Sequence, residues 1–214
     1  MRKVLSWVTV PAFLLMTGSG AWASITLHAD LSTTAETIVI NPTTNPGGLP
    51  RPLSFGTADF VLNDAQNAMT MTVTVHNIDF TGNQTPNDSN DNLANAHIHA
   101  SATVTPTTTA GVVWGFIGSP FNDNAPNDVV VTPFVGDVGG TVTAKWDAGE
   151  GNGTTLTAQL ANILSGHSYI NFHTAQFGGG EIRGNIAVVP EPASVGLLAA
   201  GALALLARAR RTRR

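Results

Sequence analysis

Residues 69–76 read Met-Thr-Met-Thr-Val-Thr-Val-His, an unbroken alternation of apolar and polar side chains. Successive side chains of a β-strand point to opposite faces of a sheet, so the apolar residues share one face and the threonines and His76 share the other. A strand with one apolar and one polar face is typical of an antiparallel sheet that packs on one side and meets water on the other. This stretch therefore predicts a strand whose apolar face belongs to the core.

The same period of two recurs from residue 24 onward, between clusters of Gly, Pro, Asn and Asp. It predicts an all-β fold, a single antiparallel β-sandwich or barrel-like domain. The other strands expected are Ser24–Leu31, Glu36–Ile40, Ser54–Leu62, Ala96–Val104, Val112–Ile117, Gly140–Trp146, Tyr169–Thr174 and Glu181–Val188. One helix is expected, at Leu156–Leu164, and long loops rich in turn-forming residues are expected at 41–52, 81–93 and 118–133.

The N-terminal segment has the order of a signal peptide. Arg2 and Lys3 precede an apolar run over residues 4–16, and the small-residue tripeptide Ala21-Trp22-Ala23 follows. Pro11 and the short apolar length argue against a membrane-spanning helix, which needs about 20 residues. Residues 1–23 are therefore predicted to be removed by signal peptidase during export.

The C-terminal segment also has three parts. Residues 189–192 read Val-Pro-Glu-Pro, residues 193–207 carry no charge, and five of the last seven residues are arginines. This pattern predicts a short apolar helix at the membrane, with its arginines on the cytoplasmic side. Pro190 and Pro192 prevent a helix from continuing upstream, so residues 24–189 are expected to fold independently of the tail at 190–214.

The motif Pro190-Glu191-Pro192, the apolar stretch and the basic end resemble the bacterial PEP-CTERM sorting signal. The resemblance implies a substrate of an exosortase, anchored transiently in the inner membrane by its tail, cleaved near the motif and delivered to the cell surface or secreted. It also implies exopolysaccharide or surface proteins as partners. A permanent tail anchor is the alternative that the same hydropathy allows.

The charge of the predicted domain is strongly acidic. Residues 24–189 contain 13 acidic residues and three basic ones, Arg51, Lys145 and Arg183, which gives a formal charge of −10. Nucleic-acid binding needs clustered Lys and Arg, so this class of partner is excluded, and cations are favoured. The chain has no cysteine, so its stability has to come from a core or from a metal.

The histidines indicate a candidate metal site. In a strand, His97 and His99 point to one face while Ile98 points to the core, and Asn171 and His173 share a face in the same way. Three imidazoles are the number that a catalytic zinc site uses, and imidazole also suits copper. The sequence therefore gives His97, His99 and His173 as candidate ligands of zinc or copper.

Glu181 and Arg183 share a face next to these strands and, with Asn171, form a candidate supporting polar cluster. With a metal bound, Glu181 is a fourth ligand or orients a histidine from outside the metal shell, and Arg183 opposes the bound cation unless it pairs with Glu181. The alternative has no metal: the histidines donate to carbonyls and carboxylates, and Glu181 with Arg183 bridges two strands. The sequence favours this alternative, because one His-x-His match is common by chance.

Three stretches, Ala96–His99, Gly166–Thr174 and Gly179–Gly184, occur in an order that resembles the CHRD domain named for chordin. The resemblance spans roughly residues 25–188, with a middle that is longer and richer in Asn and Asp than the family pattern. It implies an extracellular β-sandwich-like module without an established enzymatic activity.

Two further possibilities carry less weight. Asp88, Asn90 and Asn92 alternate like the first ligands of an EF-hand loop, but Leu93 stands where that loop needs glycine, so a solvated loop is favoured over a calcium site. A superoxide-dismutase-like site needs more metal-binding histidines than the pattern of His28, His76 and His167 provides. Weak calcium binding across the acidic loops remains compatible with the charge.

No residue pattern predicts an enzyme: the sequence has no cysteine nucleophile, no Gly-x-Ser-x-Gly elbow and no phosphate-binding loop. Large aromatic residues would stack on sugar rings if they were exposed, although they are more often buried; they are Trp114, Phe116, Phe121, Phe134 and Trp146. The sequence predicts a non-catalytic surface or matrix module that binds protein, glycan or its own copies. The alternative is a metal-binding protein, redox-active in one form, that uses the three histidines.

Overall fold

The computed structural model describes residues 24–190 and 201–203. The predicted signal peptide, Glu191, Pro192 and most of the tail lie outside the described residues, and residues 201–203 are helical. No helix in the described part of the chain is both long enough and apolar enough to cross a membrane.

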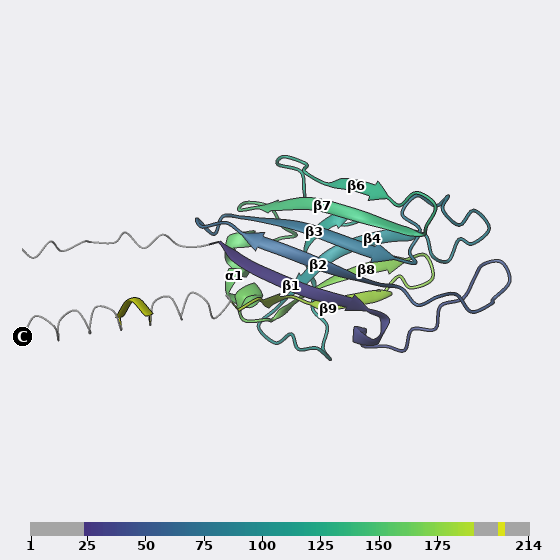
Figure 1. The fold of residues 1–214 in the computed structure, drawn as a ribbon, viewed down its shortest axis with the longest axis horizontal. Coiled ribbons are helices and arrows are strands. Elements are labelled where there is room, and N and C mark those ends of the chain that lie inside the picture. Colours follow the sequence, from purple (N-terminus) through teal and green to yellow (C-terminus); the bar gives the residue numbers. More distant parts are fainter. Residues whose placement is uncertain (1–23, 191–200, 204–214) are drawn as a thin grey trace, which may run out of the picture.

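Within these residues, ten strands form one antiparallel sheet (Figure 1). They are β1 (Ile25–Ser32), β2 (Phe55–Leu62), β3 (Ala68–His76), β4 (Leu93–Ala100), β5 (Val112–Ile117), β6 (Val130–Pro133), β7 (Gly139–Asp147), β8 (Ser168–Thr174), β9 (Ile182–Asn185) and β10 (Ala187–Val188). A 3₁₀ helix η1 spans Thr33–Ala35 and one α-helix α1 spans Leu156–Leu164. The predicted all-β class is confirmed.

The sheet curls into a half-barrel. Its strand order is β5-β4-β8-β9-β1-β2-β3-β7-β6, with β10 beside β1. In Figure 1, β4 and β8 lie behind β2 and β3, so the inner faces of the two halves face each other. The end strands β5 and β6 do not pair with each other, which leaves the barrel open.

The core lies between these inner faces. The apolar side of β3 is buried as its alternation predicts, and Val73 pairs with Ala58 of β2 and Val142 of β7. Trp114 of β5 stacks on Trp146 of β7 with ring centroids 5.4 Å apart, so indoles from the two ends of the sheet meet in the core. The buried apolar residues extend from Leu27 to Ile186, so residues 24–189 contain the whole described core.

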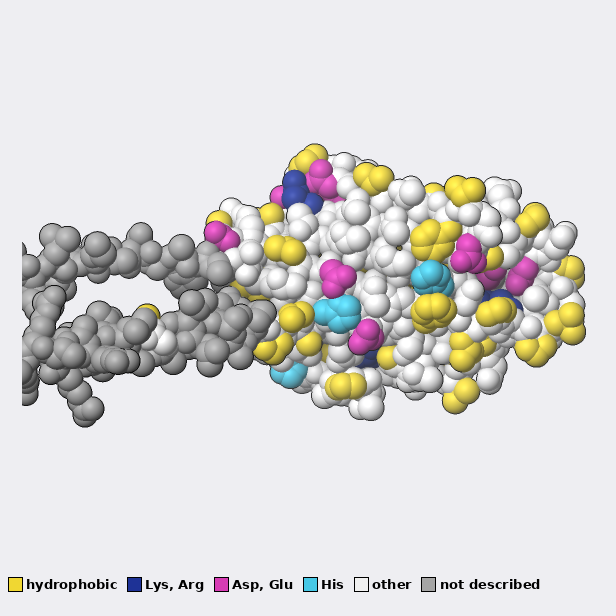
Figure 2. All heavy atoms as spheres, in the orientation of Figure 1, with side chains coloured by type: hydrophobic (Ala, Val, Ile, Leu, Met, Phe, Trp, Pro, Cys, Tyr) yellow, Lys and Arg dark blue, Asp and Glu magenta, His cyan; other side chains and the backbone are white. Residues whose placement is uncertain are grey.

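The outer face of the β2–β3–β7 half is solvated. Figure 2 views this half from outside: backbone and uncharged polar side chains cover most of it, among scattered hydrophobic, acidic and histidine side chains and few basic ones. The outer face of the β4–β8 half differs, because every residue of β8 is buried. Hydrogen bonds tie residues 105–110 and 178 to this face. The polar side chains of β4 and β8 are therefore enclosed under loops.

Three of the five aromatic residues that the sequence offers as sugar-stacking candidates are not at the surface. Trp114, Phe116 and Trp146 are buried in the core. The Trp146 indole Nε1–H donates to the Glu150 carbonyl at 2.7 Å, which satisfies its polar atom. Of the five candidates, Phe121 is the one with a large exposed fraction.

The expected strand Glu36–Ile40 is wrong. Ser32 ends β1 and caps η1, since its hydroxyl accepts the Ala35 N–H at 3.2 Å, and the Glu36 N–H then closes the turn onto the Thr33 carbonyl. Ile38 and Val39 are 58% and 83% exposed, because no neighbouring strand pairs with this segment. High β-propensity without a pairing partner therefore does not produce a strand.

Three other elements also differ from expectation. The loop expected at 118–133 contains β6, which pairs with β7. The strand expected at Ala96–Val104 is β4, which begins and ends earlier, at Leu93 and Ala100. The expected strand Glu181–Val188 is divided into β9, which lies between β8 and β1, and β10, which pairs with β1 alone. Tertiary pairing sets these boundaries, and the local alternation does not reveal it.

Replacing Phe60 by alanine should lower the free energy of unfolding of residues 24–189 by about 3–5 kcal/mol, because the fully buried ring would leave a cavity. Val61→Ala on the outer face of the same strand is the matched control and should stay within about 0.5 kcal/mol. Urea unfolding measures both. Equal losses in the two variants would contradict the assignment of faces to β2.

Candidate metal centre

Three histidines converge on the enclosed outer face of β4 and β8. His97, His99 and His173 each offer a ring nitrogen, and these atoms lie within 4.8 Å of one another. The closest pair is His97 Nδ1 and His173 Nε2, at 3.3 Å. The three residues are 4%, 7% and 6% exposed. We call them the three-histidine centre.

Strand geometry brings the histidines together. The period of two places His97 and His99 on one face of β4, and the register that pairs Asn95 with His173 brings the β8 histidine diagonally beside His97. Gly115 of β5 provides the space, since a Cβ at that position would lie 3.0 Å from His97 Cδ2 and would clash with the Pro120 carbonyl oxygen. Sequence reasoning missed Gly115, because its role depends on the β4–β5 pairing.

Backbone carbonyls fix the orientation of two of the rings. His99 Nδ1–H donates to the Ala110 carbonyl at 2.9 Å, and His173 Nδ1–H donates to the Gly178 carbonyl at 3.1 Å. This arrangement leaves an unprotonated Nε2 on both rings, as in histidines that bind metals; on His173 this atom lies 3.3 Å from His97 Nδ1. Among the described residues, Nε2 of His97 and of His99 have no hydrogen-bond partner.

Burial keeps the three rings neutral. It lowers the pKa of His97 and of His99 to about 4, and it lowers the pKa of His173. The neighbouring imidazoles lower the pKa of His97 further, because positive charges in one cluster repel. Neutral imidazoles at pH 7 are the form that binds a metal ion. Three imidazoles without a thiolate fit zinc or copper, and each ion would supply Lewis acidity or, for copper, redox chemistry.

The family model of the CHRD domain matches residues 23–186, which include all three histidines and the strands that carry them. The chain belongs to the CHRD domain family. The PEP-CTERM protein-sorting motif matches residues 188–211 directly after it. Comparisons with curated proteins and with solved structures gave no match. The protein is thus an exported, surface-sorted CHRD module, and its motif implies processing by an exosortase.

Glu181 of the CHRD domain does not reach the three-histidine centre or Arg183. Its fully buried carboxylate accepts hydrogen bonds from both terminal nitrogens of Arg51, at 2.8 and 2.6 Å, and from the hydroxyls of Ser54 and Thr174. The predicted Glu181–Arg183 pair is therefore wrong. Glu181 precedes β9, where the chain faces the 51–54 segment, and Arg51 lies 130 residues away in the sequence.

Arg183 has a different environment. Its guanidinium donates to the carbonyls of Thr105 and Thr108 at 2.9 Å each and lies 3.6 Å above the Tyr169 ring. Tyr169 in turn stacks on His99, with ring centroids 4.6 Å apart and an interplanar angle of 4°. The aromatic ring therefore separates the cationic guanidinium from the three-histidine centre.

Asn171 and Glu36 lie near the three-histidine centre, and Glu36 was not among the predicted residues. A Cβ at Gly180 would clash with Asn171 Nδ2 at 2.5 Å and with Asn171 Oδ1 and Glu36 Oε1 at 2.6 Å each, so the missing side chain of this glycine lets Asn171 and Glu36 approach each other. Neither oxygen has a hydrogen-bond partner among the described residues. Burial raises the pKa of Glu36 to about 7, although the positive charge of Arg183 acts against this rise.

The candidate calcium ligands are tied to a neighbouring loop. Asp88 Oδ1 accepts the backbone N–H groups of Asn45 and Asn90, at 2.8 and 2.9 Å. The Asn90 side chain donates to the Thr43 carbonyl at 2.8 Å. These contacts of Asp88 and Asn90 join the 41–52 and 81–93 segments of the CHRD domain, while Oδ1 of Asn92, the third candidate, is buried without a hydrogen-bond partner among the described residues.

The stability of the CHRD domain should depend on pH through Glu36. Its pKa is about 7 in the folded state against 4.5 for the free group, so its contribution is fully present below pH 4.5 and is lost as pH rises through 7. Relative to the wild type, Glu36→Gln should therefore gain on the order of 1–2 kcal/mol between pH 4.5 and 8. Urea unfolding of both proteins with EDTA measures this difference, and a difference that stays constant with pH would refute it.

Arg51→Ala should lower the free energy of unfolding by about 3–5 kcal/mol, because it leaves the Glu181 carboxylate buried without its cation. Adding Glu181→Gln removes that charge and should restore part of the loss. A double-mutant cycle followed by urea unfolding tests this coupling. Simple additivity of the two losses would show that the pair does not act as a unit.

Proposed function

We propose that the CHRD domain is a non-catalytic module that binds one zinc or copper ion through His97, His99 and His173 and carries it at the cell surface. The observation that carries the proposal is the convergence of three buried imidazoles on one point, two of them oriented by backbone carbonyls. Both features are typical of histidines that ligate a metal.

The unpartnered nitrogens favour a metal over a metal-free polar cluster. Buried polar atoms in proteins nearly always have a hydrogen-bond partner, because an unpaired one loses its hydration without compensation. In the described part of the domain, His97 Nε2 and His99 Nε2 lack one. The one close contact between the rings joins His97 Nδ1 to His173 Nε2 at 3.3 Å and does not involve His99. A bound ion would give the lone pair of His99 Nε2 a partner.

The enclosure of the centre supports a role other than catalysis. A catalytic zinc site keeps one coordination position open to substrate. Here loop residues Ala110 and Gly178 hydrogen-bond to the histidines, which are almost completely buried. The ion would instead hold the loops at 101–111 and 175–180 against the sheet, and these ordered loops would offer a surface to a glycan, a surface protein or another copy.

The terminal segments fit delivery of such a module. Removal of residues 1–23 during export and exosortase cleavage near Pro190-Glu191-Pro192 would leave a product close to the matched CHRD segment, residues 23–186. The formal charge of −10 over residues 24–189 would raise the local concentration of cations around it.

Residues 24–189, purified without a histidine tag, should contain about one zinc or copper ion per chain by elemental analysis. His97→Ala and His173→Ala should each lose it. His76→Ala is the matched control and should retain it, because His76 stacks on Phe55 on the opposite half of the sheet. Folded wild-type protein that contains no metal and binds neither added zinc nor added copper would refute the proposal.

A further inference from the structure

The three-histidine centre offers an ion neutral ligands and no negative charge. Among the described residues, the converging ligand atoms come from His97, His99 and His173, and this group contains neither a carboxylate nor a thiolate. A divalent ion bound by three imidazoles therefore keeps both of its positive charges, and a monovalent ion keeps one. The charge of the ion becomes the property that decides how well it fits.

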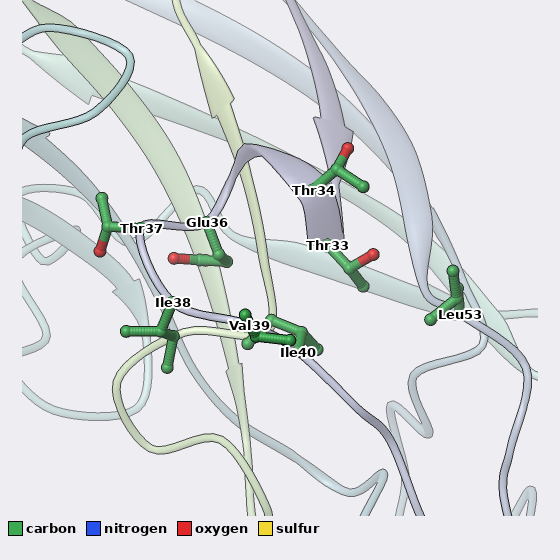
Figure 3. A pocket seen from close by; sticks show the side chains of 8 residues that line it. All are labelled: Thr33, Thr34, Glu36, Thr37, Ile38, Val39, Ile40 and Leu53. Carbon is green, nitrogen blue, oxygen red and sulfur yellow. The ribbon is translucent and has the colours of Figure 1, made fainter.

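The carboxylates on neighbouring segments do not compensate a bound ion. Glu181 pairs with Arg51. Glu36 lines a separate surface groove of about 410 Å³, formed by residues 33–40 with Leu53, and none of the three histidines belongs to this lining. Figure 3 shows Glu36 in this groove, among threonines and aliphatic side chains. Neither carboxylate is among the converging ligands of the three-histidine centre.

A positive charge acts on the centre from behind Tyr169. The Arg183 guanidinium lies 3.6 Å from the centroid of the Tyr169 ring, and this ring stacks on His99 with centroids 4.6 Å apart. The charge of Arg183 lowers the pKa of His99, so its field reaches the imidazole through the stack. Coulomb repulsion is proportional to the charge of the ion, so Arg183 opposes a divalent ion about twice as strongly as a monovalent one.

The burial of the centre makes a second charge costly. The three histidines are almost completely buried, and the Nε2 atoms of His97 and His99 are out of contact with solvent. The free energy needed to move an ion from water into low-dielectric surroundings grows with the square of its charge, so it is about four times larger for a divalent ion. The number of ligands favours the same choice: zinc in proteins takes four ligands, whereas the closed-shell ion Cu⁺ is commonly three-coordinate.

We propose that the three-histidine centre selects Cu⁺ over Zn²⁺ and Cu²⁺. The inference rests on the proposed metal site and names the ion that this site holds. Three imidazoles supply a complete set of ligands for Cu⁺, and this ion adds a single positive charge next to Arg183. The module would therefore carry copper at the cell surface in its reduced form.

The test compares the dissociation constants of the metal-free protein, residues 24–189, for the three ions. A chromophoric Cu⁺ chelator competes for Cu⁺ under argon with ascorbate present, and fluorescent chelators compete for Zn²⁺ and Cu²⁺. The wild type should bind Cu⁺ on the order of a hundredfold more tightly than either divalent ion, because both charge effects favour the monovalent ion.

The paired variants His99→Glu and His99→Gln separate the effect of charge from that of the ligand atom. Both replace an imidazole nitrogen by a side-chain oxygen of similar reach, but the glutamate alone adds a negative charge. The preference for Cu⁺ over Zn²⁺ should be on the order of tenfold smaller in His99→Glu than in His99→Gln. His76→Glu adds the same charge on the opposite half of the sheet and should keep the wild-type preference within about twofold. Circular dichroism checks that each variant is folded.

A second measurement needs no variant. Addition of one electron converts bound Cu²⁺ to Cu⁺ and removes its electron paramagnetic resonance signal, so a titration with redox mediators gives the midpoint potential of the copper-loaded wild type. Tighter binding of Cu⁺ raises this potential above that of copper ions in water. A hundredfold preference for Cu⁺ over Cu²⁺ corresponds to a rise of about 120 mV.

The outcomes separate the two proposals. If the wild type binds none of the three ions, the proposed metal site fails and the selectivity fails with it. If it binds Zn²⁺ or Cu²⁺ as tightly as Cu⁺, or if the potential is not raised, the metal site stands and the selectivity for Cu⁺ is refuted. An equal preference in folded His99→Glu and His99→Gln would show that charge does not determine the choice of ion, which also refutes the inference.

Discussion

The pairing of β4 with β8 determines both the core and the candidate site. Its register places Ile98 opposite Ile170 in the core and His97 opposite Asn171 on the other face. A slip of one residue would exchange the faces, sending the histidines into the apolar core and the isoleucines under the loops. The alternation along these two strands therefore specifies the hydrophobic core and the three-histidine centre together, and neither can shift alone.

The domain buries two arginine side chains, and each of them needs its own partners. Arg51 neutralises Glu181 on one side of β9, while Arg183 bonds to loop carbonyls and is separated from His99 by the Tyr169 ring. The two buried guanidinium groups thus have separate partners. The positive charge of Arg183 nevertheless acts on His99 and lowers its pKa, which helps to keep that imidazole neutral.

The local alternation predicted much of the fold: β5 and α1 have the bounds that the sequence predicts, and β3 begins one residue earlier than predicted. It also placed the three histidines on one face, because the period of two needs only the strand. The partner of Glu181 could not be found in this way, because Arg51 is remote in sequence and lies in a loop. Glu36 was missed for a related reason: a β-prone segment failed to pair, and its carboxylate turned toward Asn171.

The free edge at β6 has a consequence for molecules crowded on a surface. The Phe134 N–H bonds to Gly139 of β7, so by alternation Val131 and Pro133 point their backbone groups away from the sheet. Proline has no N–H, and the preceding Val129 N–H is taken by the Asn127 side chain. The edge therefore presents one strand donor, from Val131, to a neighbour. An edge strand with so few free backbone donors disfavours pairing with the edge strand of another molecule. Densely displayed copies would therefore remain separate modules instead of growing into fibrils.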